Sequence, residues 1–207
     1  MPGRKAPERE RREQILNAAM SVASARRLSG LTIREVARAA GLSTGLVLFH
    51  FKSRDGLIRA LLTWLLHQNS MLQSAASRRA HNGDSIASVV HDECIRLAST
   101  RQRTELLFDY WVTGTRHPEL RQVMRATVRR YRQEFRALAT SALRGKRSAL
   151  PGVSADAVSA AAVSFIYGCG MQAVIDPQHF DVHDVLAVIS ALTDSKRRTR
   201  TRTRTER

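Results

Sequence analysis

The chain has 207 residues, 43% of them hydrophobic, which is enough to bury one large core or two smaller ones. Its net charge of +16 at pH 7 predicts a polyanionic partner such as nucleic acid. The chain has only two cysteines, which argues against a disulfide scaffold and a structural zinc site. Its N-terminus is charged and lacks the apolar core region of a signal peptide, so we expect a cytoplasmic protein.

The chain begins with a basic arm, residues 1–7, whose last residue, Pro7, suits the first turn of a helix. This helix should run to about residue 27. Arg4 and Lys5 on the arm either contact DNA or stay solvated, and the sequence leaves both possibilities open.

The strongest local signals lie in residues 32–55. Thr32 followed by Glu35 has the form of a capping box, and Gly41 is free to take the positive φ of a tight turn. Ser43 then caps another helix. The stretch therefore predicts two short helices joined by a turn, a helix-turn-helix whose second helix can enter the major groove of DNA.

A long apolar stripe follows the N-cap Ser53 and continues past what a small domain can bury, so this helix should link two domains. The predicted organisation is a DNA-binding domain at 1–55, a ligand-binding and dimerisation domain at 56–193, and a disordered basic tail at 194–207. The tail carries 7 Lys/Arg against 2 Asp/Glu and contains no apolar residue after position 194, so it is expected either to hold DNA electrostatically or to stay solvated.

The helical pattern continues to the tail. Five further helices are expected at about residues 85–100, 104–114, 118–143, 154–176 and 181–192. No segment shows strand alternation. The predicted fold is therefore all-α, with a three-helix N-terminal domain, a larger helical domain and about nine helices.

The uncharged segment 157–175 carries Ala160, Ser164 and Gly168 at steps of four. Such a ridge of small side chains allows a second helix to approach closely, which favours a homodimer interface, although intrachain packing alone would give the same pattern. The segment approaches the length of a membrane span, but its polar and small residues favour a buried helix over a membrane partner.

The second domain is expected to hold a cavity for a small-molecule effector. Its candidate lining residues are Trp64, Phe108, Trp111, Tyr131 and Tyr167, although aromatic residues at helical spacing also occur as plain core. A Trp and Tyr pair can hold a cation by cation–π attraction, but the basic surroundings argue against one. We expect no cofactor and no metal, because Asp181 is better explained as a helix start than as a metal ligand between His179 and His183.

Residues 10–58 resemble the DNA-binding domain of TetR-family transcriptional regulators. The matching residues are Ile15, Ala18, Ala19, Gly30-Leu31-Thr32, Ile33, Val36, Ala37, Ala40-Gly41-Leu42-Ser43-Thr44-Gly45, His50-Phe51-Lys52-Ser53, Asp55 and Leu57. The stretch from Phe108 to Leu143, with the helix that ends before Asp176-Pro177, is similar to the C-terminal domain of the BetI-type subgroup. The resemblance implies a dimeric repressor that a ligand releases from a palindromic operator.

The resemblance also implies DNA-contacting residues. Base edges would be met by Arg34 and by Thr44, Gly45, Leu46 and Leu48 of the recognition helix, which Ser43 begins, and phosphates by Phe49, His50, Lys52 and Arg54. Many family members have a hydroxyl-bearing residue where this chain has Leu46 and Leu48. Because leucine can contact the thymine methyl but cannot form hydrogen bonds, we expect thymine contacts from these two residues, unless one of them, Leu46 more readily than Leu48, packs into the core.

Two other classes of function remain at this stage. The charge and the basic tail are compatible with an architectural protein that coats DNA without sequence specificity. A helical enzyme that uses the C-terminal cavity is the second alternative, and the sequence argues against it because it contains no phosphate-binding loop and no recognised nucleophile motif.

Overall fold

The structure is a computed structural model that describes residues 7–81, 84–144 and 152–188, with the side chains of all of these except residues 68–81. The predictions for the arm at residues 1–6 and for the tail at 194–207 lie outside the described residues. Within the described ranges, every regular element is a helix, as predicted.

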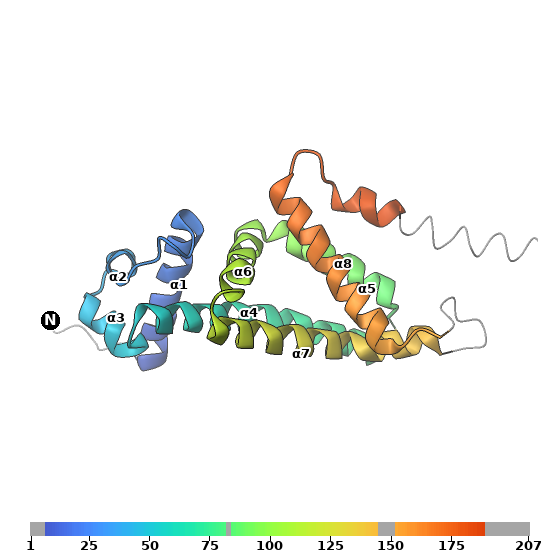
Figure 1. The fold of residues 1–207 in the computed structure, drawn as a ribbon, viewed down its shortest axis with the longest axis horizontal. Helices are drawn as coiled ribbons and strands as arrows, with labels where there is room; N and C mark the ends of the chain where they lie inside the picture. The colour runs from blue at the N-terminus through green and yellow to red at the C-terminus, as the bar shows by residue number, and fades with distance from the viewer. Residues whose placement is uncertain (1–6, 82–83, 145–151, 189–207) are drawn as a thin grey trace, which may run out of the picture.

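Eight labelled helices make up most of the described chain. They are α1 (Glu8–Arg26), α2 (Ile33–Ala40), α3 (Thr44–Phe51), α4 (Arg54–His81), α5 (Ile86–Ser99), α6 (Arg101–Gly114), α7 (Pro118–Leu143) and α8 (Ala155–Ile175). Residues 182–188 are also helical and run to the edge of the described chain. Figure 1 shows α1, α2 and α3 at one end, with α4 leading from them into the layers formed by α5 to α8.

The helix starts that the sequence predicted are formed by the expected hydroxyl groups. The Thr32 hydroxyl accepts a hydrogen bond from the Glu35 N–H at 3.2 Å, and the Ser43 hydroxyl accepts one from the Leu46 N–H at 3.2 Å. Gly41 ends α2 with φ at +67°, a conformation that glycine adopts without strain. The Glu35 carboxylate binds Arg38 at 2.7 Å, so the reciprocal half of the predicted capping box is replaced by an ion pair on the surface.

One helix boundary was predicted wrongly. The sequence placed the start of α6 at Thr104, but α6 begins at Arg101. Thr104 is buried, and its hydroxyl donates to the Leu97 carbonyl at 2.9 Å, which ties α6 to the end of α5. A threonine that resembles a helix cap therefore serves as a contact between two helices.

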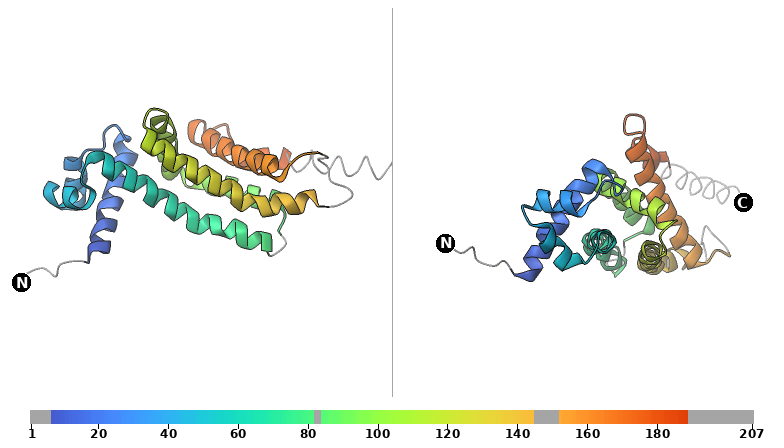
Figure 2. Two further views of the ribbon diagram at one scale, coloured as in Figure 1. Left: turned by 60° about the horizontal axis from the view of Figure 1, so that its bottom comes forward. Right: turned by 60° about the vertical axis from the view of Figure 1, so that its left-hand side comes forward.

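Two hydrophobic clusters hold the helices together. The first joins α1, α2 and α3 to the first half of α4, and it continues into α6 and the start of α7 through Leu106, Tyr110 and Met124. The second joins α5, the C-terminal half of α7, α8 and residues 182–188. Figure 2 shows α4 and α7 running side by side, and these helices are in contact. Packing crosses residue 55, so the division into domains at that position remains a proposal.

Candidate DNA-binding surface and effector cavity

Helix α3 presents one face to solvent and buries the other. Val47 and Phe51 enter the N-terminal core, whereas Thr44 and Gly45 are exposed, Leu48 is 40% exposed and Phe49 is 65% exposed. Leu48 and Phe49 are exposed next to each other, and adjoining exposed apolar side chains are typical of a surface that meets a partner. The exposed face contains residues that the sequence predicted to meet DNA.

The remaining predicted contacts flank this face. Arg34 on α2 is exposed, and Ser43 and Lys52 are exposed at the two ends of α3. Leu46 is half-buried, so neither the expected thymine contact nor the alternative of core packing is excluded. His50 is half-buried, and its carbonyl accepts a hydrogen bond from Arg12 of α1 at 2.8 Å. Contact of these residues with DNA remains a prediction.

The turn from α3 into α4 depends on Gly56, a residue that the sequence analysis did not single out. A Cβ atom at Gly56 would lie 2.2 Å from the Phe51 carbonyl oxygen, which no side chain allows. The Gly56 N–H also donates to the hydroxyl of Ser53 at 3.0 Å, the predicted cap of α4. An isolated glycine close to a helix start was the available signal, since such a residue often marks a close backbone approach.

Arg54 has a structural role that the sequence did not predict. Its guanidinium donates to the carbonyls of Leu31 at 2.7 Å and Leu28 at 2.8 Å, and to that of Ser29 at 3.4 Å. These bonds tie the start of α4 to the segment between α1 and α2. The guanidinium is thus already engaged within the chain, and its predicted contact with a phosphate remains untested.

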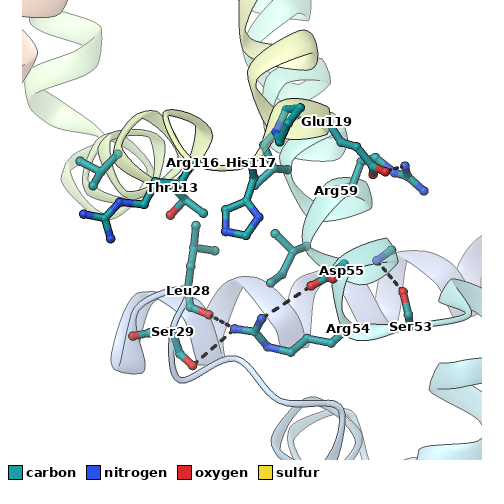
Figure 3. Close-up of a pocket in the computed structure, with 15 residues that line it drawn as sticks. Leu28, Ser29, Ser53, Arg54, Asp55, Arg59, Thr113, Arg116, His117 and Glu119 are labelled. Atoms are coloured by element: carbon teal, nitrogen blue, oxygen red, sulfur yellow. Dashed lines mark hydrogen bonds and ion pairs between the residues drawn. The ribbon is translucent and has the colours of Figure 1, made fainter.

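An open cleft of about 700 Å³ separates this junction from the connection between α6 and α7. Figure 3 shows Leu28, Ser29 and Arg54 on one side of the cleft and Thr113 and His117 on the other. Arg59 and Glu119 bridge α4 and α7 at its edge with a 2.6 Å ion pair. The cleft leaves open space between the N-terminal helices and the rest of the molecule.

A second, closed cavity lies among α4, α5, α6, α7 and α8. Its lining includes three of the five predicted effector-binding residues, namely Trp111, Tyr131 and Tyr167. The other two do not line it: Trp64 is half-buried and packs against the N-terminal core, and Phe108 is half-buried. The cavity measures about 20 Å³, which is room for about one water molecule.

A buried polar cluster adjoins this cavity. The Tyr131 hydroxyl donates to Glu93 at 2.7 Å, and Arg96 donates to the same carboxylate oxygen from Nε at 3.1 Å and from Nη2 at 2.6 Å. Burial raises the pKa of the Tyr131 hydroxyl, and the neighbouring Glu93 carboxylate adds to this shift, so the phenol stays protonated. The sequence alone does not reveal this cluster, because Glu93 and Arg96, three residues apart on a helix, have the spacing of an ordinary surface ion pair.

The predicted ridge on α8 lies at an open surface. Ser164 is exposed, and Ala160 and Gly168 are half-buried. Apart from the adjoining backbone of α8 itself, no atom of the described residues lies within 4 Å of where a Gly168 Cβ would be. Met171 and Ile175, 46% and 74% exposed, extend this apolar strip, while the opposite face of α8 packs on α5 and α7. Among the described residues, α8 is the one helix long and apolar enough to cross a membrane, a test that core helices also pass.

No group of three or more His, Cys, Asp or Glu residues within the described ranges is placed to hold a metal. Asp181 accepts the His183 N–H at 2.8 Å, as expected of a helix start. Cys94 and Cys169 are free and buried, and burial raises the pKa of both thiols, which disfavours the reactive thiolate.

Two family models match the chain. Residues 15–61 match bacterial regulatory proteins of the tetR family. Residues 84–198 match the C-terminal part of BetI-type transcriptional repressors, and this match covers more than half of the 207 residues.

Individual proteins show the same relationship. The chain is 29% identical to the HTH-type transcriptional regulator BetI of Stenotrophomonas maltophilia over 133 residues, which are 61% of this chain and 66%, just under two thirds, of that relative. It is 25% identical to BetI of Cronobacter sakazakii over 175 residues, which are 83% of each chain.

Solved structures share the fold. A member of the TetR family from Streptomyces coelicolor A3 superimposes with a TM-score of 0.71 at 21% identity, over 88% of this chain and 98% of that one. A transcriptional regulator from Saccharomonospora viridis in complex with choline superimposes with a TM-score of 0.67 at 16% identity, over 90% and 97% of the two chains.

Proposed function

Because the chain belongs to the TetR family of bacterial regulatory proteins and carries a C-terminal part of the BetI repressor type, it is a transcriptional regulator, and we propose that it acts as a homodimeric repressor in the cytoplasm. In this proposal the dimer binds a palindromic operator, and a small molecule that enters the C-terminal cavity releases it.

The observation that carries the proposal is the exposed face of α3. Its start is fixed by the Ser43 cap and its end by Gly56, so the helix presents Thr44, Gly45, Leu48 and Phe49 on a rigid support. A helix presented in this way can lie in a major groove. Arg34 and Lys52, both exposed, flank it with positive charge.

The uncharged strip on α8 supports a dimer. One helix-turn-helix contacts few base pairs, whereas a two-fold dimer places two recognition helices about 34 Å apart, one DNA turn. The strip around Gly168 is apolar, open and flat, as a close helix–helix interface requires. We propose that the partner subunit's α8 covers it.

Helix α6 connects the cavity with the DNA-binding helices. Trp111 lines the cavity, and its neighbour Tyr110 donates a buried 2.8 Å hydrogen bond to the Ile58 carbonyl of α4. On another face of α6, Glu105 lies 3.6 Å from Arg27, which directly follows α1. An effector that displaces Trp111 would therefore shift α6 and change the tilt of α4, with the open cleft providing space for the movement. The shift requires that the effector bind the two states with different affinity.

A selection of bound sequences from random duplex DNA, followed by footprinting, tests the proposal. We expect one short palindrome and a protected region of fixed length. Protection that grows with DNA length, without a selected sequence, would instead indicate an architectural protein that coats DNA.

Substitutions at Gly168 test the dimer interface. Gly168→Leu should abolish dimerisation and operator binding, because the larger side chain would separate the paired helices, while each subunit stays folded since the position is open in the monomer. Gly168→Ala is the matched control and should retain the dimer. Sedimentation gives the oligomeric state, and a Gly168→Leu variant that remains dimeric would exclude this surface.

A further inference from the structure

The lining of the closed cavity is mostly apolar and carries a positive charge. It consists of Leu66, Leu97, Leu107, Met124, Val128, Thr127, Trp111, Tyr131, Tyr167 and Arg96, so that one residue in this described lining is charged, and its charge is positive. The Glu93 carboxylate, which binds Arg96, lies outside this lining and accepts hydrogen bonds from Arg96 and Tyr131 through its Oε2 atom. The described lining therefore contains an arginine but no carboxylate of its own to attract a cationic ligand.

Arg96 has unused hydrogen-bonding capacity. A guanidinium carries five N–H groups in a planar fork. Glu93 takes the edge formed by Nε and Nη2, and Nη1 is buried with no hydrogen-bond partner among the residues that the structure describes. A buried donor that is left unpaired costs free energy, and a ligand that supplies an acceptor recovers this cost. Among ligand groups, a carboxylate is the best match because it can bind a guanidinium edge through two oxygens.

The aromatic residues are poorly arranged to hold a cation. Tyr167 packs edge-to-face on Trp111 at 5.6 Å and on Tyr131 at 5.9 Å between ring centroids. In such pairs the edge of one ring covers one face of another, which leaves fewer faces open to a cation. The rings instead offer an apolar wall beside the guanidinium.

Building on the proposed repressor function, we infer that the effector is a small organic carboxylate, whose carboxylate binds Nη1 of Arg96 and whose apolar body lies against Trp111 and Tyr167. A cavity of about 20 Å³ must open to admit it. Trp111 is the movable part of the wall, since it is 38% exposed whereas Tyr131 is buried. Entry of the ligand then displaces Trp111. Its neighbour Tyr110 joins α6 to α4 through the hydrogen bond to the Ile58 carbonyl.

Binding is measured by tryptophan fluorescence in the full-length dimer. The chain has two tryptophans, so a Trp64→Phe background leaves Trp111 as the sole reporter. The probes are octanoate and phenylacetate, each compared with its primary amide, and choline and phenyltrimethylammonium as cations. We expect the carboxylates to change Trp111 fluorescence and to release operator DNA. The affinity of their amides should be lower by at least about tenfold, because a charged acceptor is exchanged for a neutral one.

Arg96→Lys tests the guanidinium while keeping a positive charge beside Glu93. Because lysine lacks the second edge of the fork, carboxylate affinity should fall about tenfold to hundredfold, with the melting temperature of the free protein little changed. Should the lysine variant fold poorly, the double variant Glu93→Gln with Arg96→Gln removes both charges and should lose the carboxylate equally. Arg101→Lys, at an exposed position outside the cavity lining, is the matched control and should bind as the parent does.

The inference is overturned if the quaternary ammonium compounds bind and the carboxylates do not, if none of the probes changes Trp111 fluorescence, or if Arg96→Lys binds carboxylates like the parent. Sequence-specific operator binding is measured in the same samples without ligand. Its presence in any of these outcomes leaves the proposed repressor function standing, whereas its absence would count against that function alone.

Discussion

The replacement Arg54→Gln tests whether Arg54 stabilises the fold or contacts DNA. In the structure the Arg54 guanidinium donates to the Leu31 and Leu28 carbonyls at 2.7 and 2.8 Å. Glutamine is too short to reach both carbonyls. We therefore expect the variant to lose the connection between the start of α4 and the segment that follows α1.

The loss of stability follows from these two bonds. A hydrogen bond to a charged group contributes about 1.5–3 kcal/mol, but the Arg54 side chain is 42% exposed, so water replaces part of what is lost. Two such bonds together would contribute about 3–6 kcal/mol, and because of the exposure the expected destabilisation is smaller, about 2 kcal/mol in total. For a chain of this size it corresponds to a fall in melting temperature of about 4–8 °C.

Thermal unfolding and operator binding at several salt concentrations measure the two effects separately. Lys52→Gln is the control, because Lys52 is an exposed cation at the end of α3 whose Nζ lies 5.3 Å from the Phe49 ring centroid. That variant should keep the parent's melting temperature and reduce the salt dependence of log K by about 0.9 for each phosphate that the protein no longer neutralises. If Arg54→Gln behaves like Lys52→Gln, with unchanged stability and a shallower salt dependence, our structural interpretation of Arg54 is refuted.

Three further predictions follow from single positions. Gly56→Ala should unfold the turn between α3 and α4, because its Cβ would meet the Phe51 carbonyl oxygen at 2.2 Å. At Gly45, by contrast, a Cβ would make only an ordinary contact with the Ser43 hydroxyl at 4.0 Å, so Gly45→Ala should stabilise α3 by up to about 1 kcal/mol while weakening operator binding. Circular dichroism melts measure the stability of both variants, and gel shifts measure their operator binding. Tyr110→Phe should cost about 1 kcal/mol in urea denaturation because it removes the hydrogen bond to α4, and an unchanged midpoint would contradict that interaction. Burial raises the pKa of the Cys94 thiol and of the Tyr110 hydroxyl, so with rising pH both groups ionise in the unfolded chain while they stay protonated in the folded protein. The free energy of unfolding should therefore fall above about pH 9. A flat profile of urea midpoints from pH 8 to pH 11 would exclude this linkage.

Local signals in the sequence were sufficient for most of the helix starts. Thr32, Ser43, Ser85 and Ser154 each accept a hydrogen bond from the N–H three residues later. Such a bond closes within one helical turn, so its geometry depends on neighbouring residues alone. The all-α fold was predictable from helical periodicity along the chain, and the family was predictable from the residues of the helix-turn-helix that resemble it. Thr104 was misplaced because its hydroxyl bonds to a different helix.

The tertiary structure decided how charged and aromatic residues are used. Arg54 and Arg96 are both arginines on helices, yet one donates to carbonyls of a distant segment and the other is buried beside Glu93 and a cavity. Likewise, Trp64 supports the N-terminal core, whereas Trp111 lines the cavity. These differences depend on how helices far apart in sequence cross and pack, and helical periodicity specifies which face a residue lies on but not which partner that face meets.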